Sequence, residues 1–339
     1  MTESVGPSGL LPVDKQSGMT SHDVVARARR LLGTRRIGHA GTLDPAATGL
    51  LVIAVGRMTR LLGYLAGVDK QYVATIRLGQ WSTTDDADGE LTPGPSPLAG
   101  QRSGTARREL PGGTPPVTET GVDAGLAALT GTIGQRPSAI SAVKIGGERA
   151  HRLVRRGENV ELPIRTVTVS RLDRCGPIRT NDRGDVDLDI RVMCSTGTYV
   201  RALARDLGDD LGLGGHVVSL RRTAVGPVDV GEAPPWRPAA PAEGDGDLLA
   251  AELIPGAVFM PRFLPAVILD DDEARAAVNG LRIPADLDRV RAPSATSVAA
   301  ATEDPVHVLL GDGGQDLVAM ADVDDQGRWR YRTVLGRKR

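Results

Sequence analysis

One carboxylate stands alone in a stretch of small residues near the start of the chain. Residues 38–51 read GHAGTLDPAATGLL, and Asp44 is the single acid among them. One interpretation is an acid in a turn, because aspartate before proline favours extended backbone and often caps a short helical turn. The other is a carboxylate nucleophile, since glycine and alanine let a substrate ring approach the backbone closely. Ordinary glycosidases need two carboxylates, and no second acid has a comparable setting.

The elements around Asp44 can be predicted from local patterns. Residues 20–23 read TSHD and precede an amphipathic segment that ends at Gly33, which predicts a capped helix with arginines on its polar face. Residues 50–55 are an apolar run before Gly56, which predicts a buried strand. This strand would fix the base of the loop that carries Asp44.

Two other side chains that could take part in chemistry lie at the ends of predicted elements. Alternation over residues 72–78 places every second side chain on one face, so Tyr72 starts a strand. Residues 165–172 and 185–194 are predicted strands of one sheet. Thr198 follows them and is expected to cap a helix over residues 199–208, with Arg201 in its first turn.

The C-terminal part has the pattern of a small β-rich module. Residues 270–273 can cap a short helix that ends at residues 279–280, and strand-like runs follow at 306–310, 317–323 and 328–335. The last run alternates arginine with aromatic residues. It is either a half-buried strand with a solvated basic face or a surface that faces RNA.

Two segments and several charge runs are interpreted as surface. Residues 92–121 carry six prolines and almost no apolar side chains, which predicts a disordered insertion, and residues 233–247 predict a surface loop. Basic clusters lie at residues 27–36 and 149–156. Acids gather in runs that we expect to be solvated faces, at residues 85–90, 270–273 and 322–325.

Composition excludes several classes of protein. The chain has 339 residues, 40% of them hydrophobic, and a net charge of -1, which indicates about two globular domains. Its two cysteines and five histidines show no CxxC, HxH or HExxH spacing, so we predict neither a disulfide framework nor a metal site. The N-terminus lacks a signal-peptide pattern, and no apolar run approaches about 18 residues, so we expect a cytoplasmic protein without membrane spans.

The stretch GHAGTLDPAATGLL resembles the catalytic motif of the bacterial TruB family, the tRNA pseudouridine-55 synthases. Five other stretches agree with motifs of this family in order and spacing, although Gln16 stands where the family's first motif usually has proline. Together they cover most of residues 11–230. These stretches are residues 13–21 (VDKQSGMTS), 69–72 (DKQY), 137–144 (PSAISAVK), 195–201 (STGTYVR) and 216–222 (HVVSLRR).

The resemblance implies an activity and a catalytic set. Uridine's glycosidic bond would break, the base would turn, and ring carbon 5 would be joined to the same ribose, with no cofactor. Asp44 would be the nucleophile, Arg201 would pair with it, and Tyr72 would stack on the base and assist proton removal. Opposite charges about 4 Å apart gain about 4 kcal/mol at an effective dielectric constant near 20, enough to keep a desolvated carboxylate ionised.

The resemblance also implies a fold and a partner. We expect an α+β fold, with a mixed, largely antiparallel sheet of the pseudouridine synthase type and flanking helices over residues 1–257. A small PUA-like RNA-binding module would occupy residues 258–339. The partner would be the T-arm of tRNA and its acceptor end, bound by a monomer. Residues 131–157 would be an RNA-gripping insertion, and candidate RNA-binding residues are Lys15, His39, Lys144, Arg149, Arg152, Arg155, Arg156 and Leu220.

Some alternatives remain open. Lys15 and Lys144 are either solvated surface charges or, as we favour, structural supports or RNA contacts near the cleft. The chain could also be a guide-RNA-dependent pseudouridine synthase, or a non-catalytic protein that binds or folds RNA. The basic stretch GGERAHRLVRRG, at residues 146–157, favours independent action, and the joint presence of Asp44, Tyr72 and Arg201 favours catalysis.

Overall fold

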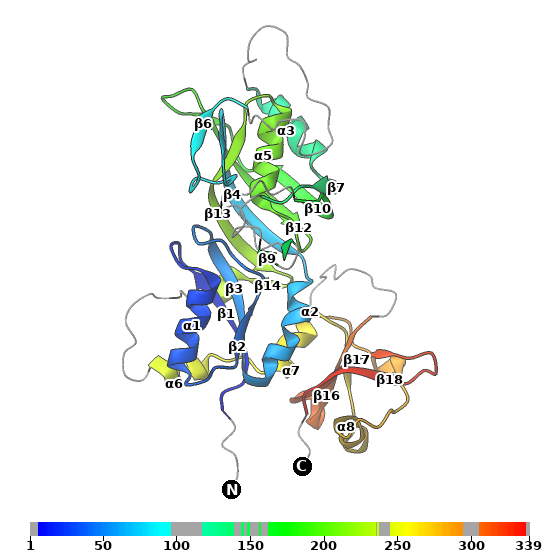
Figure 1. The fold of residues 1–339 in the computed structure, drawn as a ribbon. Coiled ribbons are helices and arrows are strands. Elements are labelled where there is room, and N and C mark those ends of the chain that lie inside the picture. The colour runs from blue at the N-terminus through cyan, green and yellow to red at the C-terminus, as the bar shows by residue number, and fades with distance from the viewer. Residues whose placement is uncertain are drawn as a thin grey trace. The chain divides into compact units, whose positions relative to one another are not determined.

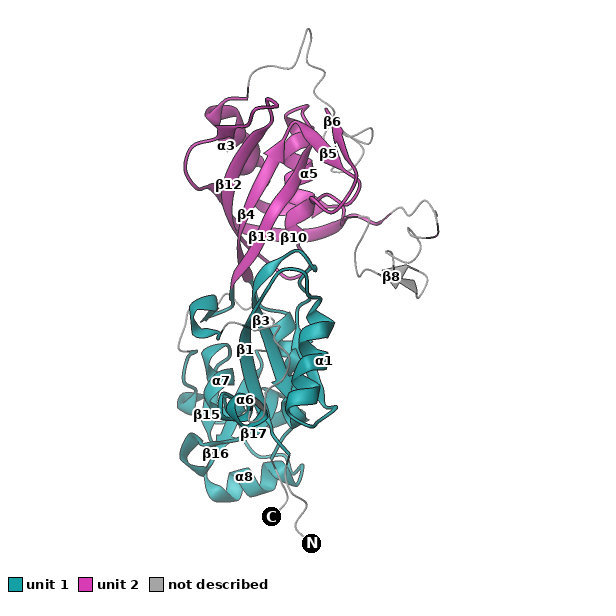
Figure 2. Ribbon diagram, turned by 90° about the vertical axis from the view of Figure 1, so that its left-hand side faces the viewer, with its two compact units in different colours: residues 1–69, 224–339 teal, residues 70–223 magenta. Residues whose placement is uncertain are grey.

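The computed structural model describes residues 6–95, 117–138, 144–145, 148–149, 156, 162–234, 236, 245–293 and 305–336. The chain divides into two compact units, which Figure 2 shows in different colours. Unit 1 consists of residues 1–69 and 224–339, and unit 2 consists of residues 70–223. In the sequence, unit 2 is therefore inserted into unit 1.

The N-terminal part of unit 1 is built on antiparallel strands (Figure 1). Strands β1 (Gly9–Lys15) and β2 (Ile37–Ala40) both pair with β3 (Thr48–Val55), and every residue of β3 after Thr48 is buried. Helix α1 (Ser21–Leu31) starts with a capping box, in which the Asp23 N–H donates to Thr20 and the Thr20 N–H donates to Asp23. The predicted helix and strand are both confirmed.

The C-terminal part of unit 1 contains a small sheet with strand order β15-β16-β17-β18. The β15–β16 pair is parallel and the other two pairs are antiparallel. Helix α8 (Asp271–Val278) begins at the predicted capping box of Asp270 and Glu273. The three predicted strands are confirmed as β16 (His307–Gly311), β17 (Asp316–Val323) and β18 (Trp329–Val334). The fourth strand, β15 (Ala266–Ile268), was not predicted.

These two parts of unit 1 share a hydrophobic core. Met58 and Leu61 belong to the same buried cluster as Phe259, Leu310 and Met320. Short elements complete the unit: η1 (Gly56–Leu61), α2 (Leu62–Ala66), β14 (Val228–Asp229), η2 (Val230–Glu232), α6 (Asp245–Ala251), α7 (Gly256–Phe259), η3 (Met260–Arg262), η4 (Leu287–Arg289) and η5 (Asp312–Gly314). The boundary at residues 257–258 and the PUA-like character stay predictions.

Unit 2 is an antiparallel sheet that carries helices α3 and α5 (Figure 1). Its strand order is β13-β4-β12-β10-β7, with β11 added beside β12. Strand β4 alternates buried and half-buried residues, as its period-two pattern predicts. The elements are β4 (Lys70–Leu78), β5 (Gln80–Ser82), β6 (Leu91–Pro93), α3 (Glu119–Ala128), β7 (Gly131–Gln135), β8 (Lys144–Ile145), β9 (Glu148–Arg149), β10 (Arg165–Arg174), β11 (Arg179–Thr180), β12 (Val186–Cys194), α5 (Val200–Asp210) and β13 (Gly215–Val225).

The predicted disordered insertion, residues 92–121, and the predicted surface loop, residues 233–247, both contain ordered structure, so the prediction of disorder is wrong at both ends of the insertion. Residues 91–93 pair with β5, and α3 begins at Glu119 because Thr118 caps it by accepting the Gly121 N–H at 3.1 Å. The remainder of the predicted insertion, residues 96–116, lies outside the described residues. Trp236, in the second predicted loop, is buried and donates its backbone N–H to the Asp14 carbonyl.

The predicted fold class is confirmed. Largely antiparallel strands and flanking helices form each unit, and the small sheet lies at the C-terminal end of the sequence. Within the described part of the chain, we find no helix with the length and apolar character needed to cross a bilayer.

Candidate active site

Asp44 lies in the connection between strands β2 and β3 of unit 1. Leu43 and Ala47 are buried on either side of it, whereas Pro45 and Ala46 are exposed and Asp44 itself is half-buried. The Ala47 N–H donates to the Asp44 carbonyl at 3.1 Å, which closes a tight turn. Two buried anchors thus present a half-buried carboxylate between them.

The start of α1 and the end of β1 brace this loop. The Ser21 hydroxyl accepts the Leu43 N–H at 2.9 Å and donates to the Leu43 carbonyl at 3.2 Å. The Gly18 N–H donates to the Pro45 carbonyl at 2.9 Å, and Lys15 Nζ donates to the same oxygen at 3.2 Å. The residues before and after Asp44 are therefore both held, which limits how far the carboxylate can move.

Lys15 is fully buried and its ammonium binds backbone carbonyls. Besides Pro45, Nζ donates to the carbonyls of Gln16 at 3.1 Å and Met19 at 2.7 Å. Because a fully buried ammonium does not reach a phosphate in solvent, the structure favours structural support over the RNA contact that was also expected for Lys15. The Lys15 ammonium therefore links the backbone after β1, through Gln16 and Met19, to the Asp44 loop, through Pro45.

His39 lies on β2, the strand that leads into the Asp44 loop. Its backbone pairs with Ile53 of β3, and its half-buried ring meets His22 of α1 edge to face, with ring centroids 5.5 Å apart. This contact joins β2 to α1 beside the braced loop. The expected role of His39 in RNA binding stays a prediction.

Tyr72 and Arg201 belong to unit 2, and both are largely buried. Tyr72 is the third residue of β4, where it pairs with Val192 of β12, and it is 9% exposed. Arg201 is the second residue of α5 and is 5% exposed. Its Nη1 donates to the Thr84 carbonyl at 2.9 Å and to Asp86 Oδ2 at 3.0 Å.

The start of α5 is fixed by a side chain from a distant strand. Tyr199 is the N-cap residue, and its N–H donates to Gln135 Oε1 at 2.8 Å while Gln135 Nε2 donates to its carbonyl at 3.1 Å. The prediction that Thr198 caps the helix is therefore wrong, because Gln135 of β7 satisfies the backbone there. This anchor sets the position of Arg201, two residues further on.

A buried group of charges lies one helical turn beyond Arg201. Arg205 donates to Asp85 Oδ2 at 2.8 Å, to Asp206 Oδ1 at 2.9 Å through Nε, and to the Arg136 carbonyl at 2.8 Å. Burial raises the pKa of Asp206 to about 6, although Arg205 opposes this shift. The expectation that acids 85–90 form a solvated face is wrong for Asp85, which is buried in this ion pair.

Sequence reasoning missed Ser21, Gln135, Asp86 and the Asp85–Arg205 pair. A signal for the last was present, because residues 201 and 205 place two arginines four apart on a helix that is otherwise mostly apolar. Such spacing puts both guanidinium groups on one face. It does not reveal which acids they meet.

The remaining predicted RNA-binding residues are placed only in part. Lys144 and Arg149 are paired in register across strands β8 and β9. Arg156 is exposed, and Leu220 is half-buried on β13. Arg152 and Arg155 lie outside the described residues. The structure thus places Asp44, Lys15 and His39 in unit 1 and Tyr72, Arg201 and Leu220 in unit 2, so the pairing of Asp44 with Arg201 stays a prediction.

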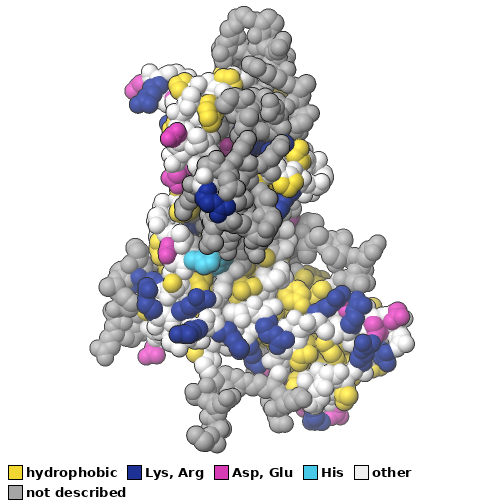
Figure 3. Space-filling view, viewed as in Figure 1, with side chains coloured by type: hydrophobic (Ala, Val, Ile, Leu, Met, Phe, Trp, Pro, Cys, Tyr) yellow, Lys and Arg dark blue, Asp and Glu magenta, His cyan; other side chains and the backbone are white. Residues whose placement is uncertain are grey.

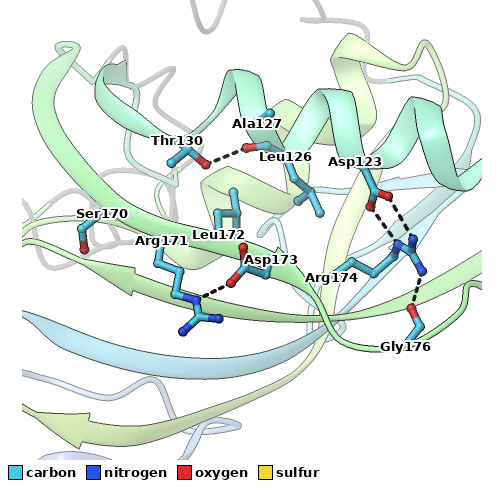
Figure 4. Close-up of a pocket in the computed structure, with 10 residues that line it drawn as sticks. All are labelled: Asp123, Leu126, Ala127, Thr130, Ser170, Arg171, Leu172, Asp173, Arg174 and Gly176. Carbon is cyan, nitrogen blue, oxygen red and sulfur yellow. Dashed lines mark hydrogen bonds and ion pairs between the residues drawn. The ribbon is translucent and has the colours of Figure 1, made fainter.

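A pocket of about 730 Å³ lies elsewhere in unit 2, between α3 and β10 (Figure 4). Leu126 and Leu172 provide apolar surface, and Arg174 is held by both carboxylate oxygens of Asp123 at 2.9 and 3.0 Å. None of the predicted site residues lines it. As for metals, the described residues include no group of three or more His, Cys, Asp or Glu side chains that could hold an ion.

Comparison with known proteins agrees with the motif set. The family model "TruB family pseudouridylate synthase (N terminal domain)" matches residues 29–200, and the model "tRNA pseudouridylate synthase B C-terminal domain" matches residues 201–234. A Thermobifida fusca (strain YX) protein named tRNA pseudouridine synthase B is 51% identical over 279 residues, covering 81% of this chain and 86% of that protein. A Nocardia farcinica (strain IFM 10152) protein of the same name is 56% identical over 234 residues, covering 68% and 70%.

A solved structure shares the fold at low sequence identity. A chain of a Cbf5-Nop10-Gar1 complex superimposes with a TM-score of 0.62 at 22% identity, covering 97% of this chain and 85% of that chain. The family model over residues 29–200 and the similar proteins define the class of pseudouridylate synthases. Within this class, the chain belongs to the TruB family.

Proposed function

We propose that this chain isomerises uridine 55 in the T-loop of tRNA to pseudouridine, without guide RNA. The braced Asp44 loop carries this proposal, because a carboxylate that attacks a sugar or a ring must be held in a productive geometry. Membership of the TruB family, and relatives named tRNA pseudouridine synthase B that match over most of the chain, support the activity and the substrate.

The reaction breaks the bond from uridine N1 to ribose and forms one from ring carbon 5 to the same ribose. The proton on carbon 5 is lost and N1 takes up a proton, so that the product is an isomer of uridine. Asp44 acts as the nucleophile, and Tyr72 stacks on the target base and assists the proton removal. Arg201 pairs with Asp44 and keeps it ionised. A guanidinium has five N–H donors, so an arginine that Thr84 and Asp86 hold through Nη1 is able to serve a second carboxylate.

Substrate binding requires a surface that attracts phosphate. Figure 3 shows Lys and Arg side chains gathered on one face of unit 1, and the exposed arginines of this unit include Arg29, Arg30, Arg35, Arg36 and Arg60. Flipping the target base out of its stack costs a few kcal/mol, which such backbone contacts offset. We further propose that a cytoplasmic monomer binds the T-arm and the acceptor end, and that residues 258–339 act as a PUA-like module.

The test uses a tRNA transcript tritiated at uridine carbon 5 and the purified chain with no added RNA or cofactor. We expect stoichiometric tritium release from the wild-type transcript. A transcript with cytidine at position 55 should release no tritium above background. Release from neither transcript by a folded protein that binds both would refute stand-alone activity, and equal release from both would refute the assignment to position 55.

A further inference from the structure

The two arginines on one face of α5 contact consecutive acids of one loop. Arg201 and Arg205 are four residues apart, so their side chains project from the same side of the helix. Arg201 binds Asp86 and the Thr84 carbonyl, and Arg205 binds Asp85. Side chains of α5 therefore bind three successive residues of the loop between β5 and β6.

Asp85 has an unusual backbone conformation at this point. Its φ is +62°, in the left-handed region that is uncommon outside glycine, although aspartate adopts it more readily than most residues. Such a conformation persists only where its surroundings determine it. Here the Asp85 carbonyl accepts the Val217 N–H at 3.0 Å, its N–H donates to the Ser82 carbonyl at 3.3 Å, and its carboxylate receives Arg205.

The left-handed residue directs the next side chain. Asp86 follows it and is held by the Asp88 N–H, which donates to Oδ1 at 3.1 Å, and by the Thr84 hydroxyl, which donates to the same oxygen. Oδ2 is thereby turned toward Arg201. A change at Asp85 would displace the carboxylate that orients Arg201.

We propose that Arg205 is a positioning residue for the reaction: it holds Asp85 in the left-handed conformation and so places Asp86 against Arg201. This inference rests on the role proposed for Arg201. Arg205 itself is 2% exposed and is anchored a second time, by Asp206 and by the Arg136 carbonyl, so it is a fixed point rather than a mobile surface charge. A guanidinium suits this task because its donors form a rigid fork that serves several acceptors at once.

The test is single-turnover tritium release with saturating enzyme, together with tRNA affinity and melting temperature. Arg205→Met should lower the single-turnover rate by roughly 10²-fold, as a small misplacement of catalytic groups does, while the Kd for tRNA changes by less than about threefold. Arg205→Lys, which keeps the charge, should restore part of the rate. In an Asp85→Gly background, where glycine adopts the left-handed conformation without strain, Arg205→Met should cost little further rate.

Leu203→Ala is the matched control, because it removes a buried apolar side chain of the same helix and leaves both arginines in place. If Leu203→Ala lowers the rate as much as Arg205→Met at an equal loss of melting temperature, the effect is stability and the proposal is overturned. A wild-type rate in Arg205→Met, or a parallel loss of tRNA binding, overturns it as well. If Arg205→Met does not fold, Arg205→Lys and the double variant decide by the same criteria. Absence of tritium release by the wild-type chain would refute the proposed function instead.

Discussion

The buried ammonium of Lys15 allows support of the Asp44 loop to be separated from contact with RNA. Lys15→Met keeps the length of the side chain and removes a donor that serves three carbonyls. All three carbonyls lose the ammonium, but that of Pro45 keeps its hydrogen bond from the Gly18 N–H, so we count the cost for the carbonyls of Gln16 and Met19. At about 1–2 kcal/mol for each buried acceptor, the free energy of unfolding should fall by about 2–4 kcal/mol.

The same substitution should slow catalysis more than it weakens binding. The Asp44 loop keeps its Ser21 brace but loses one of its two anchors at Pro45, so we expect the single-turnover rate to fall roughly 10- to 100-fold. The assay combines urea unfolding, tritium release and tRNA binding between about 50 and 200 mM salt. The slope of log K against log salt should stay that of the wild type, because a buried ammonium neutralises no phosphate.

Arg36→Ala is the matched control, since Arg36 is exposed in the basic segment of unit 1. If Arg36 contacts phosphate, its loss should reduce the salt slope by about one without changing the unfolding free energy. A reduction of the slope by about one in Lys15→Met, at wild-type stability, would refute the structural role of Lys15 and restore the RNA-contact interpretation.

Other predictions concern the supports of α5 and the C-terminal sheet. Burial raises the pKa of Asp206 to about 6, so its ionised carboxylate destabilises the fold above that pH and ceases to do so below about pH 4. The difference in unfolding free energy between Asp206→Asn and wild type, measured by urea unfolding, should therefore change by about 3 kcal/mol between pH 4 and 7. A difference that stays constant with pH would contradict this. Gln135→Leu should cost about 1–2 kcal/mol and slow single-turnover release, since it removes both bonds to the Tyr199 backbone. Asp322→Asn should destabilise the C-terminal sheet by about 1–3 kcal/mol, because buried Asp322 binds Arg330 and Arg332. A melting temperature equal to that of the wild type would show that these two ion pairs do not stabilise the sheet.

Local patterns predicted the elements that local interactions determine. The capping residues of α1 lie three positions apart, and the alternation in β4 is written in consecutive residues, so neither depends on the rest of the chain. The buried strand that follows the Asp44 loop was also predictable, whereas β2, the strand before the loop, was not predicted. The family resemblance of the Asp44 motif then indicated the chemistry that its carboxylate would perform.

The supports of the site were not predictable because they join distant residues. Arg205 and Asp85 are 120 residues apart, and Gln135 lies 64 residues before Tyr199. An acid in a run of acids is usually solvated, so the sequence favoured an exposed Asp85. Lys15 likewise resembles a surface charge until the carbonyls that surround it are known.

The alternating arginines of β18 show how burial decides between two interpretations. Arg330 and Arg332 both bind the buried carboxylate of Asp322, and Trp329 is buried beside them. The strand is thus half-buried, with its basic face tied to an acid of the same sheet. An RNA-facing role for these arginines stays a prediction.

The most direct test of the proposed function replaces the carboxylate of Asp44. Asp44→Asn keeps the shape of the side chain, and tritium release from the tRNA transcript is measured beside binding and melting temperature. We expect no release, with a Kd for tRNA within about threefold of wild type and an unchanged melting temperature. Release at the wild-type rate would show that Asp44 is not the nucleophile, and loss of binding and stability together with activity would show that it is a structural acid.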